Sequence, residues 1–395
     1  MRVAVGAGVA VVFLAVLTVA FHNFLTSRYP GANDYYARWR PVRAWLFEGR
    51  SPYADSVTRD TQLGMYGRLA LPREDKGLFS YPFFSVIFFA PFALVPSYAW
   101  SSAAWLAVLL ACLLALLPLS LAWAGWRPAP LLFALTALFG LAWYPAVRVL
   151  FLGQFAAIEA VLIVGALLAV RARRDEWAGV LLALSLTKFQ LVFLLIPGLM
   201  LWAPTHRRWK LIAWFGGAAA ALVGGSLLLM PTWIGEWRAQ LGAYVEQTFI
   251  GSPVAVITEW LLPGAGHWPE AVVSGGLMLY LLWEWWRARG DAGGAQWEWA
   301  ASLTLVITNL VGLRVATSNY VVMTPALFWV FSRWGRRSTA WVALAQAALF
   351  IGLWALFLAT VRGNQEQALM YPPLPILLFA GLLAVRPGSV NGWNG

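Results

Sequence analysis

The sequence carries little charge, and this scarcity limits the class of protein more than any other feature. Asp, Glu, Lys and Arg make up 11% of the 395 residues, whereas hydrophobic residues make up 61%. A water-soluble globular protein needs more polar residues than this to cover its surface. The composition therefore predicts a polytopic membrane protein. Its spanning segments are expected to be α-helices, because a helix satisfies its backbone hydrogen bonds internally.

Cysteine and histidine are scarce as well. The single cysteine, Cys112, lies within an apolar run, and the chain has three histidines. One cysteine excludes an internal disulfide and disfavours a thiolate metal site. The sequence also lacks a Walker loop, a dinucleotide fingerprint and an HExxH motif, which disfavours an enzyme of soluble nucleotides. We expect no metal, no cofactor and no nucleic-acid partner.

Apolar runs long enough to cross a bilayer recur along the chain. The first, at residues 3–24, is expected to stay in place as a signal-anchor, because no small-residue cleavage site follows it. Further runs lie at residues 98–123, 129–147, 154–170, 211–230, 271–286, 297–313, 319–334, 339–361 and 372–386.

Two other apolar segments do not fit a simple span. The segment from Trp177 to Trp202 contains Lys188 and lies between two basic clusters, "RARRDE" and "THRRWK". Because Lys and Arg are retained on the cytoplasmic side, this segment is predicted to enter the membrane and return as two short helices that turn at Lys188. Residues 82–96 are short and interrupted by prolines, which predicts a re-entrant or juxtamembrane element.

The net charge of +11 is first a signal of topology. With the assignments above, the basic short loops all fall on the cytoplasmic side, which gives about twelve membrane segments with both chain ends inside. We expect a single domain over residues 1–395. It would comprise a first membrane helix at 3–25, a first outer loop at 26–97, further membrane helices over 98–386 and a second outer loop at 231–269.

The first outer loop is basic where the topological rule gives no reason for positive charge. Residues 26–81 hold nine basic and six acidic side chains. Contact with anionic head groups explains this excess as well as a phosphate-bearing substrate does. Within the loop, residues 34–47 predict an amphipathic helix in the membrane interface, kinked near Pro41. Its predicted apolar face holds Tyr36, Trp39, Val42 and Leu46.

Ionisable residues within the membrane, or at the outer ends of its helices, are functional candidates because charge is costly there. These residues are Asp34, Arg148, Glu159, Lys188, Arg314 and Arg362. Asp34 suits a general base, and it suits equally the N-cap of the interfacial helix. Glu159 suits catalysis, an ion pathway or a structural ion pair with Lys188.

Transfer of a sugar from a lipid phosphate would use such groups. A base removes the proton of the acceptor hydroxyl, and cations stabilise the phosphate that leaves, so that no metal is needed. Asp34 is the candidate base. The candidate cations for the donor phosphate are Lys188, Arg148 and Arg314.

Five motifs follow one another along the chain. They read "NDYYARWRPVRAWLFEGRSPYAD", "FSYPFFSVIFFAPFALVP", "FLGQFAAIEA", "WAGVLLALSLTKFQLVFLLIPGLML" and "RVATSNYVVMTPALFWV". This order resembles glycosyltransferase family 87, whose GT-C superfamily membrane enzymes include polyprenyl-phosphate-mannose-dependent mannosyltransferases. The resemblance implies an all-α GT-C fold and an inverting transfer from a lipid-linked sugar on the outer side of the cytoplasmic membrane.

The resemblance also places family roles on residues of this chain. It assigns the acidic base to Asp34, the lysine of the fourth motif to Lys188 and the glutamine of the third motif to Gln154. The late polar turn falls on Arg314, Ser318, Asn319 and Tyr320. Candidate substrate-binding residues are Tyr35, Arg38, Tyr81, Gln154, Glu159, Asn319 and Tyr320.

The chain departs from the family pattern at four places. Many members have an asparagine shortly after the Gly-Gln pair, where this chain has apolar residues and then Glu159. Phe83 and Phe189 stand where members often have proline, and "TSNY" replaces a turn that often contains histidine. These departures leave the expected fold unchanged, but the residues do not identify the sugar or the acceptor. Mannose is expected only because the better-known members of the family use it.

A transporter or flippase of lipid-linked sugars is the alternative, with Glu159 and Lys188 as its coupling pair. The large basic outer loop and the lack of sequence repeats favour the enzyme. We therefore expect a multi-pass glycosyltransferase of the cell membrane whose active site faces outward. Its partners would be membrane lipids, a lipid-linked sugar donor and a glycolipid or glycan acceptor.

Overall fold

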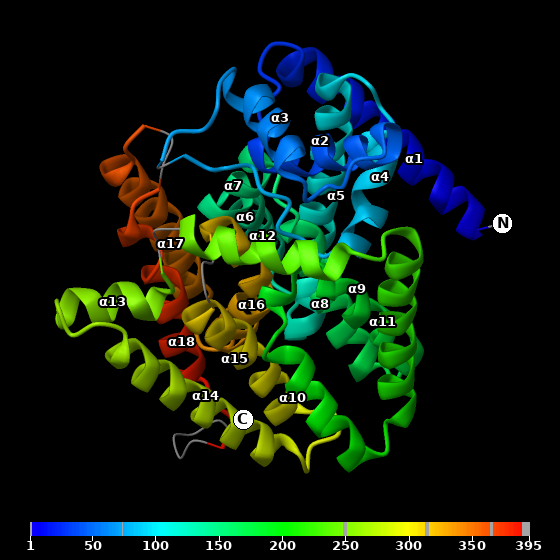
Figure 1. The fold of residues 1–395 in the computed structure, drawn as a ribbon. Coiled ribbons are helices and arrows are strands. Elements are labelled where there is room, and N and C mark those ends of the chain that lie inside the picture. Colours follow the sequence, from blue (N-terminus) through cyan, green and yellow to red (C-terminus); the bar gives the residue numbers. More distant parts are fainter. Residues whose placement is uncertain (1, 73, 248–250, 313–315, 364–365, 389–395) are drawn as a thin grey trace. The chain divides into compact units, whose positions relative to one another are not determined.

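Helices form every regular element in the part of the chain that the structure describes. The computed structural model describes residues 2–72, 74–247, 251–312, 316–363 and 366–388 (Figure 1). The first ten elements are α1 (Arg2–Phe21), η1 (His22–Thr26), α2 (Asn33–Glu48), α3 (Asp55–Tyr66), η2 (Phe83–Ser85), α4 (Val86–Ala93), α5 (Tyr98–Ala124), α6 (Pro130–Ala142), α7 (Tyr144–Leu152) and α8 (Ala156–Arg171).

The remaining elements follow the same pattern of long helices and short turns. They are α9 (Asp175–Ser185), η3 (Leu186–Leu191), α10 (Leu195–Trp202), η4 (Ala203–His206), α11 (Trp209–Leu229), α12 (Trp233–Gln247), α13 (Pro253–Leu261), α14 (Trp268–Ala288), α15 (Ala295–Val311), η5 (Thr317–Met323), α16 (Thr324–Gly335), α17 (Thr339–Thr360), η6 (Ala368–Met370) and α18 (Pro373–Ala384). The label η marks 3₁₀ helices, except η1, which is a π-helix.

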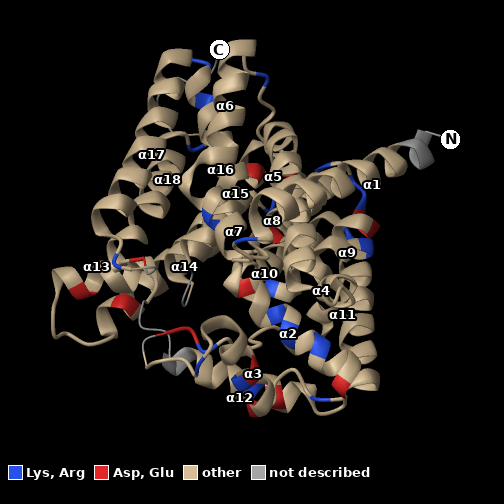
Figure 2. Ribbon diagram, turned by 90° about the horizontal axis from the view of Figure 1, so that it is seen from above, with Lys and Arg blue, Asp and Glu red and all other residues tan. Residues whose placement is uncertain are grey.

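Five helical segments among the described residues are long and apolar enough to cross a bilayer. They are Gly6–Thr26, Tyr98–Ala124, Pro130–Leu152, Trp209–Leu229 and Thr339–Thr360. The helices differ in charge (Figure 2): α5 and α17 contain no charged residue, whereas α2 and α3 carry charged residues of both signs. The chain is therefore a membrane-embedded protein. The further segments that would bring the total to about twelve stay predictions.

The apolar run predicted at 129–147 extends further and is bent. Helix α6 ends at Ala142, Trp143 is extended (φ −65°, ψ 154°), and α7 begins at Tyr144. Pro145 lies in the first turn of α7, where a missing N–H costs nothing. The bend therefore follows from the "WYP" sequence.

The chain divides into two compact units. The first contains residues 1–114, 148–158 and 220–249, and the second contains residues 115–147, 159–219 and 250–395. In the first unit, α2 packs against α3 and α4. In the second, α15 packs against α14, α16 and α18, and its side chains from Ala300 to Leu310 are all buried.

The predicted amphipathic helix forms as α2 and contains Pro41, and two residues of its expected apolar face, Trp39 and Val42, are buried. Tyr35 is fully buried and Tyr36 only half-buried. The hydroxyl of Tyr36 lies where a Cβ on Gly64 of α3 would be, so the absence of a side chain at Gly64 lets the two helices approach. Sequence periodicity marks a face, but it does not reveal which neighbour lies opposite.

The segment around Lys188 is a helical hairpin, as its charge pattern predicts. Helices α9 and α10 are separated by η3, in which Lys188 has non-helical backbone angles (φ −125°, ψ 60°). The guanidinium of Arg208, after α10, donates to both carboxylate oxygens of Asp175, at the start of α9, with Nε at 2.8 Å from each. The two ends of the segment therefore lie together, and Lys188 lies at its turn.

Candidate functional site

Asp34 lies in the first turn of α2, but it does not cap that helix. The N-cap position is Ala32, which has left-handed backbone angles and makes no side-chain capping hydrogen bond. The carboxylate of Asp34 instead accepts a hydrogen bond from the side-chain amide of Gln154. The structure thus disfavours the helix-cap role and joins two residues that are 120 positions apart in the chain.

Gly153 explains how Gln154 reaches Asp34. Its φ is +69°, and a Cβ there would lie 2.8 Å from the Cβ atoms of both Ala32 and Tyr35. The indole Nε1 of Trp105 donates to the Gly153 carbonyl at 2.8 Å. Only glycine combines this backbone angle with such close packing, so the "GQ" pair of the third motif docks directly on the start of α2.

A crevice too narrow to admit a water molecule lies at the Asp34–Gln154 pair. It is lined by Asp34, Arg38, Tyr81, Phe89, Gly153, Gln154 and Phe155. The guanidinium of Arg38 lies 4.5 Å from the centre of the Tyr81 ring, and its Nη1 donates to the Leu78 carbonyl at 2.7 Å. A carboxylate, an amide, a cation and aromatic faces therefore meet here, and a carboxylate can take a proton from a hydroxyl that comes within hydrogen-bond distance.

Tyr35 and Arg148, two other predicted site residues, lie outside this lining. Tyr35 is buried, shares a hydrogen bond of 2.6 Å with Ser101 and stacks on Trp105. Burial raises the pKa of its phenol well above the usual value, with the Ser101 hydrogen bond opposing that rise. The guanidinium of Arg148, in α7, lies 5.5 Å from the centre of the Phe151 ring. Tyr35 thus supports α2 through packing.

Tyr244 is not among the residues that line the crevice, but the carboxylate of Asp34 influences it electrostatically, and the sequence did not reveal this. It belongs to α12, within the second predicted outer loop. Burial raises the pKa of its phenol to about 12, and the nearby carboxylates of Asp75 and Asp34 add to that rise while Arg38 opposes it. One tyrosine among many apolar residues gives no signal of such a neighbour.

A second polar group lies in the other compact unit, around Lys188. The ammonium group of Lys188, which is 3% exposed, donates to Asn319 Oδ1 at 2.6 Å. Glu159 is fully buried, and within the described residues neither of its carboxylate oxygens accepts a hydrogen bond. The positive charge of Lys188 interacts with the Glu159 carboxyl electrostatically. Among the described residues, however, the two side chains do not form an ion pair.

Further hydrogen bonds connect the segment of Asn319 with Tyr144 and with residues 366–371. The hydroxyls of Tyr144 and Thr317 both donate to Oε1 of Glu366, at 2.5 Å and 2.6 Å. Tyr320 donates to the Tyr371 carbonyl at 2.8 Å. Glu366 was not among the sequence candidates, because no local pattern marks it. Thr317 lies in the fifth motif, but no role was assigned to it. Arg314, a predicted phosphate ligand, lies outside the described residues.

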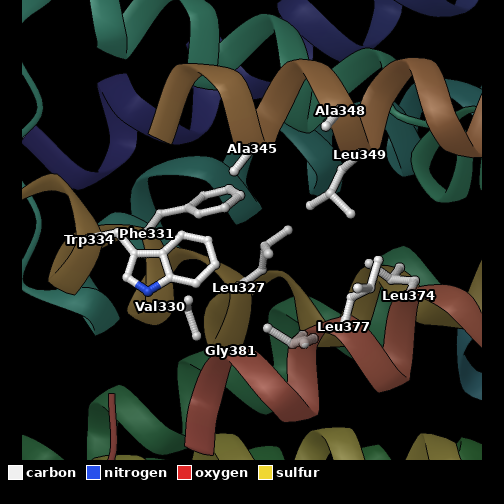
Figure 3. A pocket seen from close by; sticks show the side chains of 11 residues that line it. Leu327, Val330, Phe331, Trp334, Ala345, Ala348, Leu349, Leu374, Leu377 and Gly381 are labelled. Atoms are coloured by element: carbon white, nitrogen blue, oxygen red, sulfur yellow. The ribbon is translucent and has the colours of Figure 1, made fainter. Parts of the chain in front are cut away.

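An apolar cavity of about 220 Å³ lies among α16, α17 and α18 (Figure 3). Phe331 and Trp334 lie toward one end of it and Leu374 toward the other. All of its lining side chains are apolar. Such a lining suits hydrocarbon and would leave a charged ligand without partners.

The described residues contain no group of three or more His, Cys, Asp or Glu side chains that could hold a metal ion. Comparison with protein families gives one match: the family described as glycosyltransferase family 87 matches residues 79–316, well over half of the chain. The matched stretch includes Tyr81, Gln154 and Lys188 and leaves out Asp34. Searches of curated proteins and of solved structures gave no match.

Proposed function

The chain belongs to glycosyltransferase family 87, and from this premise we propose that it transfers a sugar from a polyprenyl phosphate to a hydroxyl of a lipid or glycan acceptor. The proposed reaction inverts the anomeric centre and takes place on the outer side of the cytoplasmic membrane. Mannose is the first sugar to test. The apolar helices support a donor that is itself held in the membrane.

The observation that carries this proposal is the Asp34 carboxylate, held by Gln154 in a crevice lined by aromatic rings and Arg38. In the proposed reaction Asp34 removes the proton of the acceptor hydroxyl. The hydroxyl oxygen then bonds to the anomeric carbon while the bond from that carbon to the phosphate oxygen breaks. The phosphate leaves with both bonding electrons, so the proton and the charge are accounted for.

Cationic side chains would stabilise the leaving phosphate. We assign this role to Lys188, Arg148 and Arg314. The support for Lys188 is its burial at the turn of a hairpin, since a buried ammonium group is costly unless it serves a ligand or a partner. No metal or cofactor enters the proposed reaction.

The experiment is transfer of labelled mannose from synthetic polyprenyl-phosphate-mannose to a lipid extract of the source organism, in detergent. Wild type should transfer, and Asp34→Asn should bind the donor but not transfer. Equal transfer by both proteins would remove Asp34 from the base role. Lys188→Met should bind the donor more weakly, and an unchanged affinity in a titration would remove Lys188 from the phosphate site.

The same assay separates this proposal from the transporter alternative. Detergent leaves no membrane to cross, so turnover of the donor there requires an enzyme. Nothing in the described residues supports the transporter, whose coupling pair would need Glu159 and Lys188 to exchange a proton or ion.

A further inference from the structure

The seven residues of η5, Thr317 to Met323, form a 3₁₀ helix that is buried along its whole length. Stretches of 3₁₀ helix longer than about four residues are uncommon, because their hydrogen bonds are poorly aligned and their side chains eclipse one another. A seven-residue 3₁₀ helix therefore needs stabilising contacts with other segments of the chain. The side-chain hydrogen bonds of η5 identify these segments.

One edge of η5 is tied to the loop at residues 366–371. Thr317 donates to Glu366 Oε1 at 2.6 Å, and Tyr320 donates to the Tyr371 carbonyl at 2.8 Å. Residues three apart lie above one another in a 3₁₀ helix, so Thr317 and Tyr320 share that edge. We name residues 366–371 the strap.

Tyr144 also binds the strap, through Glu366. Its hydroxyl donates to the same Glu366 oxygen at 2.5 Å, and its ring packs on Trp354 and Phe357 of α17. Hydrogen bonds from hydroxyls to a carboxylate are stronger than bonds between neutral groups. Glu366 thus joins the start of α7, the start of η5 and the strap.

The neighbouring edge of η5 carries Asn319, which accepts from Lys188 at 2.6 Å. One residue in a 3₁₀ helix turns the side-chain direction by about 120°, so Asn319 points away from the strap while Tyr320 points toward it. Both η3, which carries Lys188, and η5 pack on α15. The rotation of η5 therefore decides whether Asn319 meets Lys188.

We propose that Glu366 is a positioning residue: through Thr317 it fixes the rotation of η5, so that Asn319 meets Lys188 at the donor-phosphate site. The identity of the ligand rests on the proposed function, whereas the claim that Glu366 holds η5 in place does not. Glu366 touches neither the reacting atoms nor the phosphate in this scheme. It acts through the strap and η5.

The experiment compares Thr317→Val with Thr360→Val as its matched control. Both changes delete one threonine hydroxyl, but the Thr360 hydroxyl donates to the Leu356 carbonyl within its own helix. Glu366→Gln and Glu366→Ala complete the set, because the glutamine amide oxygen still accepts a hydrogen bond. Thermal unfolding in detergent shows which variants fold. If Glu366→Ala does not fold, Thr317→Val still tests the proposal.

Two readouts are taken on the same samples. Hydrogen exchange of the peptide that covers η5 is measured without ligand, and the affinity for a non-transferable polyprenyl-phosphate sugar is measured by titration. We expect faster exchange in η5 and an affinity about tenfold weaker or more for Thr317→Val and Glu366→Ala. Glu366→Gln should recover part of both effects, and Thr360→Val should match wild type.

Each outcome decides between the two proposals. Unchanged exchange in η5 would overturn the positioning role. Faster exchange with unchanged donor affinity would also overturn it, since the strap would then stabilise the fold alone. If wild type itself binds no donor, the proposed function loses its substrate, whereas the exchange data still decide whether Glu366 holds η5.

Discussion

At the scale of single residues, the glycine before Gln154 has the clearest physical role. Gly153 has φ +69° and lies where a Cβ would meet the Cβ atoms of Ala32 and Tyr35 at 2.8 Å. An alanine there requires both a strained backbone and a shift of the first turn of α2. Asp34 lies in that turn, so its hydrogen bond to Gln154 depends on a residue that carries no chemistry.

Gly153→Ala should destabilise the protein by about 2 kcal/mol or more and lower the transfer rate. The matched control is Gly49→Ala, because Gly49 has a similar φ of +65° and nothing within 4 Å of its added Cβ. Gly49→Ala carries the same cost of a positive φ, but its Cβ does not collide with neighbouring atoms. Unfolding in detergent and the transfer assay measure the two effects, and equal behaviour of the two variants would refute the packing argument.

Glu74 gives a prediction about pH. It accepts hydrogen bonds from Arg68 Nη1 at 2.7 Å and from the Leu71 amide at 2.8 Å. The hydrogen bond from Arg68, more than that from Leu71, lowers the pKa of this carboxyl from 4.5 to about 2. Because the folded pKa is lowered, the contribution to stability is complete above pH 4.5 and is lost as the pH falls through about 2.

Hydrogen exchange of the peptide over residues 66–72 should therefore lose protection in that acidic window. Glu74→Gln should start with less protection and show a weaker dependence on pH, because an amide does not titrate. A wild-type loop whose protection stays constant from pH 5 to about 2 would show that the carboxylate does not hold it.

Residue identities could be predicted from the sequence only where chemistry or a motif marks them. Asp34, Gln154 and Lys188 are polar residues in apolar surroundings, and their motif order resembles a family. Tyr244 and Glu366 have no such mark, because what distinguishes them is a neighbour far away in the chain. Their positions depend on tertiary packing, which no local pattern records.

At the scale of elements, α9 and α11 approach each other unusually closely at Gly179. A Cβ on Gly179 would lie 2.6 Å from the Phe215 amide nitrogen and 2.9 Å from the Leu211 carbonyl oxygen. Backbone atoms cannot move aside as a flexible side chain can. Helix packing therefore explains Gly179, the first glycine of the fourth motif. The same packing holds the hairpin that carries Lys188.

Gly179→Ala should destabilise the protein by about 1–3 kcal/mol, because the two helices must separate. Gly217→Ala in α11 is the control, since nothing lies within 4 Å of its added Cβ. In a helix without such contacts, alanine is more favourable than glycine by about 0.5–1 kcal/mol. The two changes should thus shift the unfolding midpoint in opposite directions, and a shift in the same direction would show that the helices do not touch at Gly179.

Elements were the best-predicted level of this structure. The apolar runs and the basic flanks predict the long helices and the hairpin at Lys188, because bilayer thickness and charge retention act on composition alone. The bend at Trp143 was missed because hydropathy marks the apolar run and not its interruption at the "WYP" sequence. The burial of Tyr35 in α2 was missed because it depends on how neighbouring helices pack, which periodicity does not specify.

At the scale of the whole molecule, charge and family membership answer different questions. The family shows a glycosyltransferase, whereas the side of the membrane on which the chemistry takes place depends on the basic loops. The cluster "RARRDE" at 171–176 and the loop that carries Asp34 are predicted to lie on opposite sides. The topology is therefore testable without any substrate.

The single cysteine makes this test simple, because Cys112→Ser leaves a chain without thiols. Ser56→Cys in α3 and Ala172→Cys after α8 then place one exposed thiol on each predicted side. A membrane-impermeant maleimide should label the Ser56 variant in intact cells, and it should label the Ala172 variant only after the cells are opened. Labelling of Ala172→Cys in intact cells would reverse the topology and place Asp34 in the cytoplasm. An outward-facing enzyme would then be wrong, whatever the assay in detergent had shown about the chemistry.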